Sequence, residues 1–218
     1  MSDECGMMSD ESASFRIHHL GEDRSVNTSL PPEEQARADI YRLLAALLAG
    51  PPGGELLGLL RGITPGEGPL ATVWKALRTA AEGADPDVLE AEYHALFIGL
   101  GRGELVPYGS WYQARFLMEK PLANLRADLA RLGFARRPEV CEPEDHAAAL
   151  CEVMGVMIAE SGLSFMESKA FFETHIGSWM GGFFEDLEGA EVARFYQPVG
   201  QLGRHFIAIE QAYYAMPA

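Results

Sequence analysis

Apolar residues recur at spacings of three and four along most of the chain, and this pattern limits the possible fold more than any other feature. Five of them lie between positions 40 and 48, and a later series runs from position 195 to position 213. Such spacing places the side chains on one face of a helix. The sequence contains no convincing run of alternating polar and apolar residues and no two-residue hairpin signal. It therefore predicts an all-α fold, a single-domain helical bundle.

Proline and glycine mark the ends of the expected helices. Pro31-Pro32 opens the first helix, and Gly50-Pro51-Pro52 ends it. A glycine-rich break runs from Gly99 to Ser110 in the middle of the chain. A later helix is expected to open at Pro143, and Pro198 is expected at a kink or late start of the last one. The other apolar series predict helical segments at about 56–60, 70–77, 86–97, 122–132 and 172–187.

The residues before the first helix differ from the rest of the chain. Residues 1–28 are polar and acidic, without the apolar centre of a secretory signal, and are expected to form a disordered leader before a helical domain at 29–218. The longest apolar run, Leu43 to Ala49, is far shorter than a membrane span. Cys5, Cys141 and Cys151 have no paired spacing, so no disulfide framework is indicated. These features predict a cytoplasmic protein without stable membrane insertion.

The formal net charge of −15 argues against a nucleic-acid partner, which would need a basic face. The charge is unevenly distributed. From Pro138 to Val192 there are twelve acidic residues and a single basic one, Lys169, whereas from Arg115 to Arg137 six basic residues face two acidic ones. The acidic segment is interpreted either as solvated helix faces or as a surface that attracts a basic peptide.

The common catalytic signatures are missing from the sequence. There is no phosphate-binding Gly-Lys loop, no complete Gly-x-Gly-x-x-Gly, no His-Glu-x-x-His and no Cys-x-x-Cys. No histidine has a glutamate three residues before it, as the di-iron helical bundles require. We therefore predict no catalytic residue, no metal ligand and no cofactor.

The densest polar cluster runs from Cys141 to His146, with Cys151 one to two turns later. A metal site is one interpretation, but the cluster mixes soft and hard ligands, and His146 and Cys151 do not share a helical face. A helix N-terminus is the favoured interpretation, with Pro143 in the first turn, acids at the positive dipole end and a side chain that caps free N–H groups. This interpretation leaves the role of His146 open.

A second unusual stretch places aromatic residues beside proline and glycine. Leu96 and Phe97 precede the glycine-rich break, and Tyr108, Trp111 and Tyr112 follow it. Such rings either line an apolar groove or hold a long loop on the core, and the residues alone favour neither.

Four ordered motifs resemble those of the TorD/DmsD family of cytoplasmic maturation chaperones. They are Leu96-Phe97-Ile98-Gly99, Pro107-Tyr108-Gly109-Ser110-Trp111-Tyr112, Glu142-Pro143-Glu144-Asp145-His146, and Phe171, His175 and Trp179 at intervals of four. The resemblance covers the chain from about Pro31 to the C-terminus, and four motifs in order are jointly specific. Two positions depart from the family pattern: Tyr108, where the family often has tryptophan, and Leu100, where it often has proline.

The resemblance implies an all-helical, non-catalytic chaperone. Members bind the twin-arginine signal peptide of a molybdopterin-containing oxidoreductase subunit and hold back its export until the cofactor is inserted. The implied partners are this peptide and the body of the subunit, and the implied state is a monomer or homodimer. His175 and Trp179 are expected to be structural residues within a helix. The implied peptide-binding residues are Leu96, Phe97, Tyr108, Ser110, Trp111, Tyr112, Glu142, Pro143, Asp145 and His146.

The chemistry of such a peptide agrees with this assignment. A basic segment followed by an apolar one requires acidic groups beside an apolar groove. Glu142 and Asp145 provide the acidic groups. The groove is provided by five apolar and aromatic side chains: Leu96, Phe97, Tyr108, Trp111 and Tyr112. Asp145 would orient His146 to hydrogen-bond peptide backbone. Two alternatives remain open at this point: a helical metal- or cofactor-dependent enzyme with a site at His146, and a generic helical adaptor.

Overall fold

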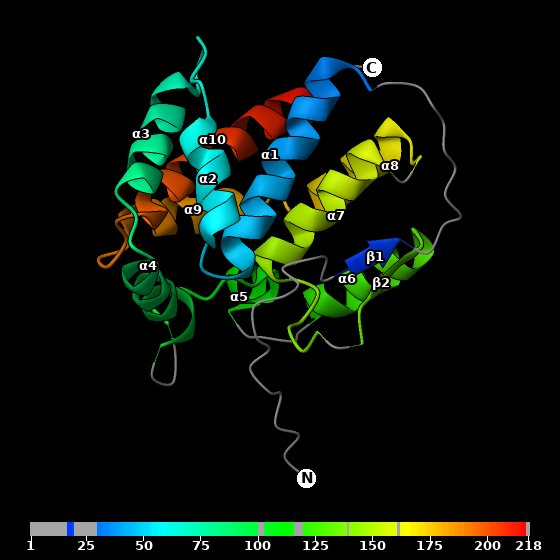
Figure 1. Cartoon of the computed structure of the whole chain (residues 1–218). Coiled ribbons are helices and arrows are strands. Elements are labelled where there is room, and N and C mark those ends of the chain that lie inside the picture. The colour runs from blue at the N-terminus through cyan, green and yellow to red at the C-terminus, as the bar shows by residue number, and fades with distance from the viewer. Residues whose placement is uncertain are drawn as a thin grey trace.

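A computed structural model of the chain describes residues 17–19, 30–99, 103–115, 120–138, 140–160 and 162–216. Helices dominate this part of the chain, which confirms the all-α prediction (Figure 1). The elements in order are β1 (Ile17–His19), α1 (Pro32–Ala49), α2 (Gly54–Gly62), α3 (Ala71–Glu82), α4 (Pro86–Tyr93), the π-helix η1 (His94–Ile98), α5 (Gly109–Ala114), α6 (Lys120–Arg131), β2 (Phe134–Arg136), α7 (Ala147–Ala159), α8 (Phe165–His175), α9 (Met180–Gly189) and α10 (Tyr196–Ala215).

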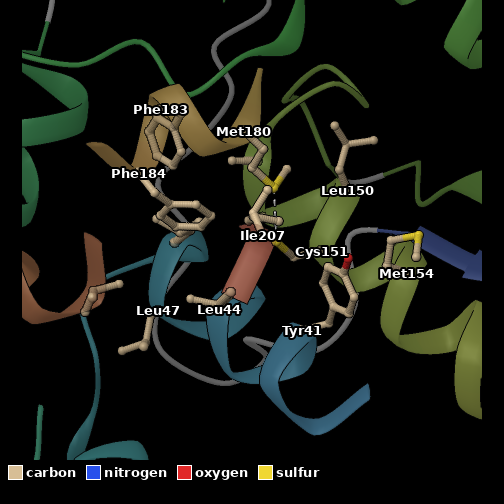
Figure 2. Packing of buried hydrophobic residues seen from close by; sticks show 14 of the residues in the cluster. Tyr41, Leu44, Leu47, Leu150, Cys151, Met154, Met180, Phe183, Phe184 and Ile207 are labelled. Carbon is tan, nitrogen blue, oxygen red and sulfur yellow. Dashed lines mark hydrogen bonds between the residues drawn. The ribbon is translucent and has the colours of Figure 1, made fainter. Parts of the chain in front are cut away.

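Helix α7 forms the centre of the bundle. Every residue from Ala147 to Met157 is buried, so apolar side chains face neighbours on all sides, as expected of a helix surrounded by protein. Its main neighbour is α1, and α9 packs in turn against α10. Figure 2 shows Tyr41 and Leu44 of α1 meeting Leu150 of α7 and Phe184 of α9 in one apolar core.

Helices α9 and α10 approach each other closely because α10 carries glycine where they cross. A Cβ atom at Gly203 would overlap the ring of Phe184, and one at Gly200 would overlap the backbone of Glu188. Glycine at these two positions therefore allows the ring of Phe184 to fill the interface.

The N-terminus of α10 is capped from a distant element. The carboxylate of Glu92, at the end of α4, accepts hydrogen bonds from the backbone N–H groups of Arg194, Phe195 and Tyr196 at 2.8, 3.1 and 2.9 Å. A carboxylate is favoured at this end of a helix, where free N–H groups and the positive end of the dipole meet. Glu92 thus joins α4 and η1 to the C-terminal half of the chain.

Three details of the sequence-based prediction need correction. Residues 17–19, expected within the disordered leader, form β1, which pairs antiparallel with β2; the rest of the leader lies outside the described residues. The single helix expected at 172–187 is interrupted by a turn at 176–179, where the indole N–H of Trp179 donates to the carbonyl of His175 at 2.7 Å. Trp179 and His175 are therefore at helix ends and not in a helix interior.

The third correction concerns the helix expected to open at Pro143. It begins four residues later, at Ala147, because His146 is the N-cap residue and the preceding residues form a turn. Pro198, expected at a kink or late start, lies in the first turn of α10, which begins at Tyr196. None of the helices in the described ranges is long and apolar enough to cross a membrane.

Candidate functional site

The second and third sequence motifs meet where α5 and α7 begin, near the lower end of α7 in Figure 1. Two backbone hydrogen bonds join them: Gly109 N–H donates to the carbonyl of Asp145 at 2.9 Å, and Ala147 N–H donates to the carbonyl of Pro107 at 2.8 Å. Tyr108 and His146 form the antiparallel bridge between these bonds. Segments about 35 residues apart are therefore fixed as one unit by their main chains.

Asp145 and His146 complete this junction with their side chains. Asp145 Oδ2 accepts from Ser110 N–H at 2.8 Å, within the N-terminal turn of α5. His146 Nδ1 accepts from Ala148 N–H at 3.1 Å and thereby caps α7. The histidine that the sequence left unexplained is thus the N-cap itself, and the acidic residue beside it serves the other helix.

The junction retains unused hydrogen-bonding capacity. Within the part of the chain that the structure describes, Ser110 Oγ and Asp145 Oδ1 are buried and accept or donate no hydrogen bond. A buried polar atom left unpaired costs free energy, so these two atoms would gain from a small rearrangement that pairs them. The junction is therefore held by its backbone hydrogen bonds, while two of its buried side-chain atoms stay unpaired.

Aromatic side chains of the N-cap residue of α5 and of α5 itself lie near this junction. The ring of Tyr108 meets the imidazole of His146 edge-on, with 5.0 Å between centroids. The ring of Tyr112 lies 5.5 Å from that of Trp179, and its hydroxyl donates to Asp186 Oδ2 at 2.7 Å. Partial burial and the charge of Asp186 both raise the pKa of Tyr112, so its hydroxyl stays protonated as a donor. Tyr108, Trp111 and Tyr112 are each partly exposed.

The first motif has a different set of neighbours from these rings. Leu96 is fully buried, and its carbonyl accepts from Leu105 N–H at 2.8 Å, which folds the chain back after the break. Phe97 is partly exposed and packs at 5.0 Å from Tyr93 and 5.5 Å from Tyr196. Leu96 therefore supports the core beneath the break, whereas Phe97 is partly exposed and Ile98 is 51% exposed. Leu100, one of the two departures from the family pattern, lies outside the described residues.

The acidic residues of the third motif have different environments. Glu142 and Pro143 are partly exposed, whereas Glu144 and Asp145 are buried. Glu144 pairs with Arg126 at 2.8 Å and with Arg136 at 3.3 Å. The basic segment of the sequence thus folds against the acidic one, and Glu142 remains the acidic residue of the motif that is partly exposed.

Two residues expected to be structural, His175 and Trp179, and one that the sequence did not indicate, Asp128, support the site. The imidazole of His175 contacts Asp128 at 2.8 Å, and Trp179 stacks near Tyr112. Burial opposes the charge of Asp128, but hydrogen bonds from His175 and Arg131 outweigh it and lower the pKa of this carboxyl. The His175–Trp179 motif was a usable signal for this support, but nothing in the sequence pointed to Asp128.

The metal interpretation of the third motif finds no ligand set here. Within the described ranges, no three His, Cys, Asp or Glu side chains are grouped as metal ligands. Nδ1 of His146 already accepts a backbone hydrogen bond. Cys151 is a buried free thiol whose pKa is raised by burial, and Cys141 is disulfide-bonded, which the spacing of the cysteines did not predict.

Comparison with protein families decides the classification. A profile of the nitrate reductase delta subunit family matches residues 66–185, which include the π-helix, α5 and the start of α7. The chain belongs to this family.

Comparison with individual relatives supports this classification. The chain is 25% identical over 203 residues to the chaperone protein TorD of Photobacterium profundum, covering 82% of this chain and 94% of the relative. It is 26% identical to the TorD chaperone of Vibrio parahaemolyticus over 57% of this chain and 63% of the relative. The fold matches a crystal structure of a putative redox enzyme maturation protein from Archaeoglobus fulgidus, with a TM-score of 0.57, 18% identity, and coverage of 85% of this chain and 99% of the other.

These findings confirm the resemblance to the TorD/DmsD chaperones. The delta-subunit family member is thus a TorD-like maturation chaperone and not an enzyme, which removes the catalytic alternative at His146.

Proposed function

We propose that this chaperone binds the twin-arginine signal peptide of a molybdopterin-containing oxidoreductase subunit in the cytoplasm. It assists cofactor insertion into the body of that subunit and holds back premature export. The observation that carries the proposal is the set of three partly exposed rings at one short helix, from its N-cap residue Tyr108 and from Trp111 and Tyr112 within it, held by a junction of two motifs.

The partly exposed residues of the junction are the proposed peptide contacts. An apolar peptide segment would lie against the rings of Tyr108, Trp111 and Tyr112, because aromatic side chains bury large apolar areas. Glu142 of the third motif would attract the basic segment of the peptide. Asp186, which accepts a hydrogen bond from Tyr112, would be a second carboxylate. Phe97 and Pro143 would extend this surface.

The buried residues of the junction have a different proposed role. Ser110, Asp145 and His146 are 0%, 3% and 5% exposed, so a peptide would not reach them without displacement of the chain. They would position the exposed rings through backbone hydrogen bonds, and Leu96 would do the same from below. Direct binding of peptide backbone by His146, expected from the sequence, would require this junction to open.

A peptide-binding experiment tests the proposal. The full-length chain is titrated with a fluorescent twin-arginine signal peptide and with a control peptide in which both arginines are alanine. We expect saturable binding of the first peptide and at least about tenfold weaker binding of the second, since loss of a charge-assisted contact costs at least about 1.4 kcal/mol. Equal affinity for both peptides would refute the proposal and leave the generic adaptor as the better description.

Variants locate the site. Tyr108→Ala and Tyr112→Ala are expected to weaken binding of the full peptide and to leave binding of a peptide truncated to its basic segment unchanged. Leu59→Ala is the matched control, because Leu59 is an exposed apolar residue on α2 with 67% of its surface accessible. Equal losses for the full and truncated peptides would contradict the division between apolar and basic contacts.

A further inference from the structure

A cavity lies at the opposite end of α7 from the junction. It has a volume of about 230 Å³ and is formed between α1, α7, α8 and α10. Clefts that bind drug-sized ligands are typically about 300–1,000 Å³. This pocket therefore suits a single side chain or another small group. Its lining includes Glu34, Arg37, Phe165, Tyr213 and Tyr214.

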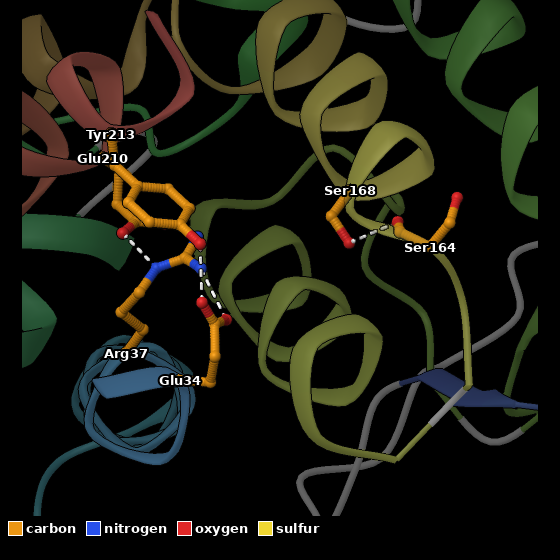
Figure 3. A network of polar contacts seen from close by, with 6 residues as sticks. All are labelled: Glu34, Arg37, Ser164, Ser168, Glu210 and Tyr213. Carbon is orange, nitrogen blue, oxygen red and sulfur yellow. Dashed lines mark hydrogen bonds and ion pairs between the residues drawn. The ribbon is translucent and has the colours of Figure 1, made fainter. Parts of the chain in front are cut away.

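Glu34, Arg37 and Tyr213 form one wall of the pocket and belong to a network of charged groups that includes Glu210 behind the wall (Figure 3). Arg37 donates from Nε and Nη2 to the two oxygens of Glu210 at 2.7 and 2.8 Å, and from Nη1 to Glu34 Oε2 at 2.6 Å. The hydroxyl of Tyr213 donates to Glu34 Oε1 at 2.6 Å. The network holds two carboxylates and one guanidinium, so it carries an excess negative charge.

The neighbouring lysine does not remove this excess. Lys169 donates to the carbonyl of Tyr214 at 2.6 Å and lies 3.7 Å from Glu173, a carboxylate on its own helix. An anionic ligand is disfavoured in such a wall, and a cationic one is favoured.

Glu34 is the carboxylate that a ligand can reach. Its side chain is 27% exposed, whereas that of Glu210 is fully buried. A carboxylate offers about four acceptor positions, and Glu34 uses two of them, for Arg37 and Tyr213. A donor entering the pocket can therefore use the rest.

Aromatic rings form the other walls. Phe165 is 39% exposed, and its ring lies 5.7 Å from that of Tyr213 and 5.5 Å from that of Tyr214. The guanidinium of Arg37 already stacks over the ring of Tyr213, at 3.9 Å from its centroid. The hydroxyl of Tyr214 is buried and, within the described ranges, has no hydrogen-bond partner. Rings, an open carboxylate and an unpaired hydroxyl together suit an organic cation.

We propose that this pocket binds an arginine side chain of a partner polypeptide. A guanidinium is planar, stacks on aromatic rings and donates parallel hydrogen bonds to a carboxylate. The remaining acceptor positions of Glu34 and the ring of Phe165 match these properties, since Arg37 already covers a face of Tyr213. The apolar side chain of Met166, 60% exposed next to Phe165, would cover the aliphatic part of the partner. The proposal concerns a surface separate from the junction and does not depend on the proposed function there.

The test uses the full-length, ¹⁵N-labelled chain and a small probe. N-acetylarginine amide and its uncharged analogue N-acetylcitrulline amide are titrated while amide chemical shifts are followed by NMR. We expect saturable shifts for the arginine probe at the amides of Glu34, Ser168 and Tyr213, and at least about tenfold weaker binding of the citrulline probe. Absence of saturable shifts at these amides, or equal binding of both probes, would overturn the proposal.

Two variant pairs complete the test. Glu34→Gln should weaken arginine binding by about tenfold, and Glu33→Gln, which changes an exposed acid in the same turn, should not. Phe165→Ala should weaken binding several-fold without loss of fold, because Phe165 is partly exposed, whereas Met166→Ala should have a smaller effect. If arginine binding survives both Glu34→Gln and Phe165→Ala, the probe binds elsewhere on the protein and the proposal is overturned.

Discussion

The two ends of α7 use similar residues for different purposes. At the N-terminal end, Asp145 is buried and accepts from the backbone of Ser110, and the rings of α5 lie outside it. At the C-terminal end, Glu210 is buried and pairs with the guanidinium of Arg37, a charge that must itself be kept in the interior. Loss of the first carboxylate frees a loop, whereas loss of the second leaves a buried charge between helices. The cost of the same chemical change therefore depends on what the carboxylate faces.

The largest expected effect is at the C-terminal end. Glu210→Ala leaves Arg37 largely buried without its bidentate partner, and we expect a loss of about 3–5 kcal/mol in the free energy of unfolding, measured by urea denaturation. Burial opposes the charge of Arg37 while Glu210 raises its pKa, so the guanidinium stays charged in the native protein. Arg204→Ala breaks the partly exposed pair with Glu188 and should cost about 1 kcal/mol. Similar losses for the two variants would contradict the comparison.

A smaller loss is expected at the N-terminal end. Asp145→Ala removes the acceptor of Ser110 N–H and should lower the free energy of unfolding by about 1–3 kcal/mol. Asp145→Asn keeps an acceptor oxygen and should cost less. We expect both variants to weaken binding of the signal peptide, because the junction that positions the rings is loosened. Unchanged peptide affinity in the folded fraction of Asp145→Ala would show that the junction is structural only.

Two variants of His146 separate its role as the N-cap of α7 from its contact with the ring of Tyr108. His146→Ala removes the N-cap of α7 and should cost about 0.5–2 kcal/mol, whereas His146→Asn restores a capping acceptor and should recover most of this stability. Neither variant keeps the edge-on contact with Tyr108. Thermal denaturation of both variants measures the cap, and peptide titration measures the contact. If His146→Asn regains stability but not peptide affinity, the imidazole positions Tyr108.

The smallest expected effect is that of salt on peptide binding. If Glu142 and Asp186 attract the basic segment, chloride should weaken binding of the full peptide a few-fold, mainly through the association rate, as the Debye length falls from about 10 Å at 0.1 M to about 3 Å at 1 M. The control peptide without arginines should respond less. Affinity that is flat or rises with chloride would mean that apolar burial alone holds the peptide, and that the acidic segment is a solvated face.

Local chemistry explains which elements the sequence predicted well. The proline and glycine limits of α1 depend on backbone geometry at single residues, and they are found as predicted. Pro198 lies in the first turn of α10, where a helix tolerates proline. The interruption at 176–179 was missed because the apolar period continues through it, from Phe172 to Leu187. Strand β1 was missed because three residues are too short for a visible period.

The sequence by itself determined that this chain is a helical bundle, that its ordered motifs are those of a chaperone family, and that the aromatic and acidic residues of those motifs belong together. Only the tertiary structure decided which of them face outward. Asp145 and His146 follow Glu142 by three and four positions, yet they are buried while Glu142 is partly exposed, because α7 begins at Ala147 and not at Pro143. The pairing of Arg37 with Glu210, 173 positions apart, likewise follows from the packing of α1 against α10, since long-range contacts leave no periodic trace in the sequence.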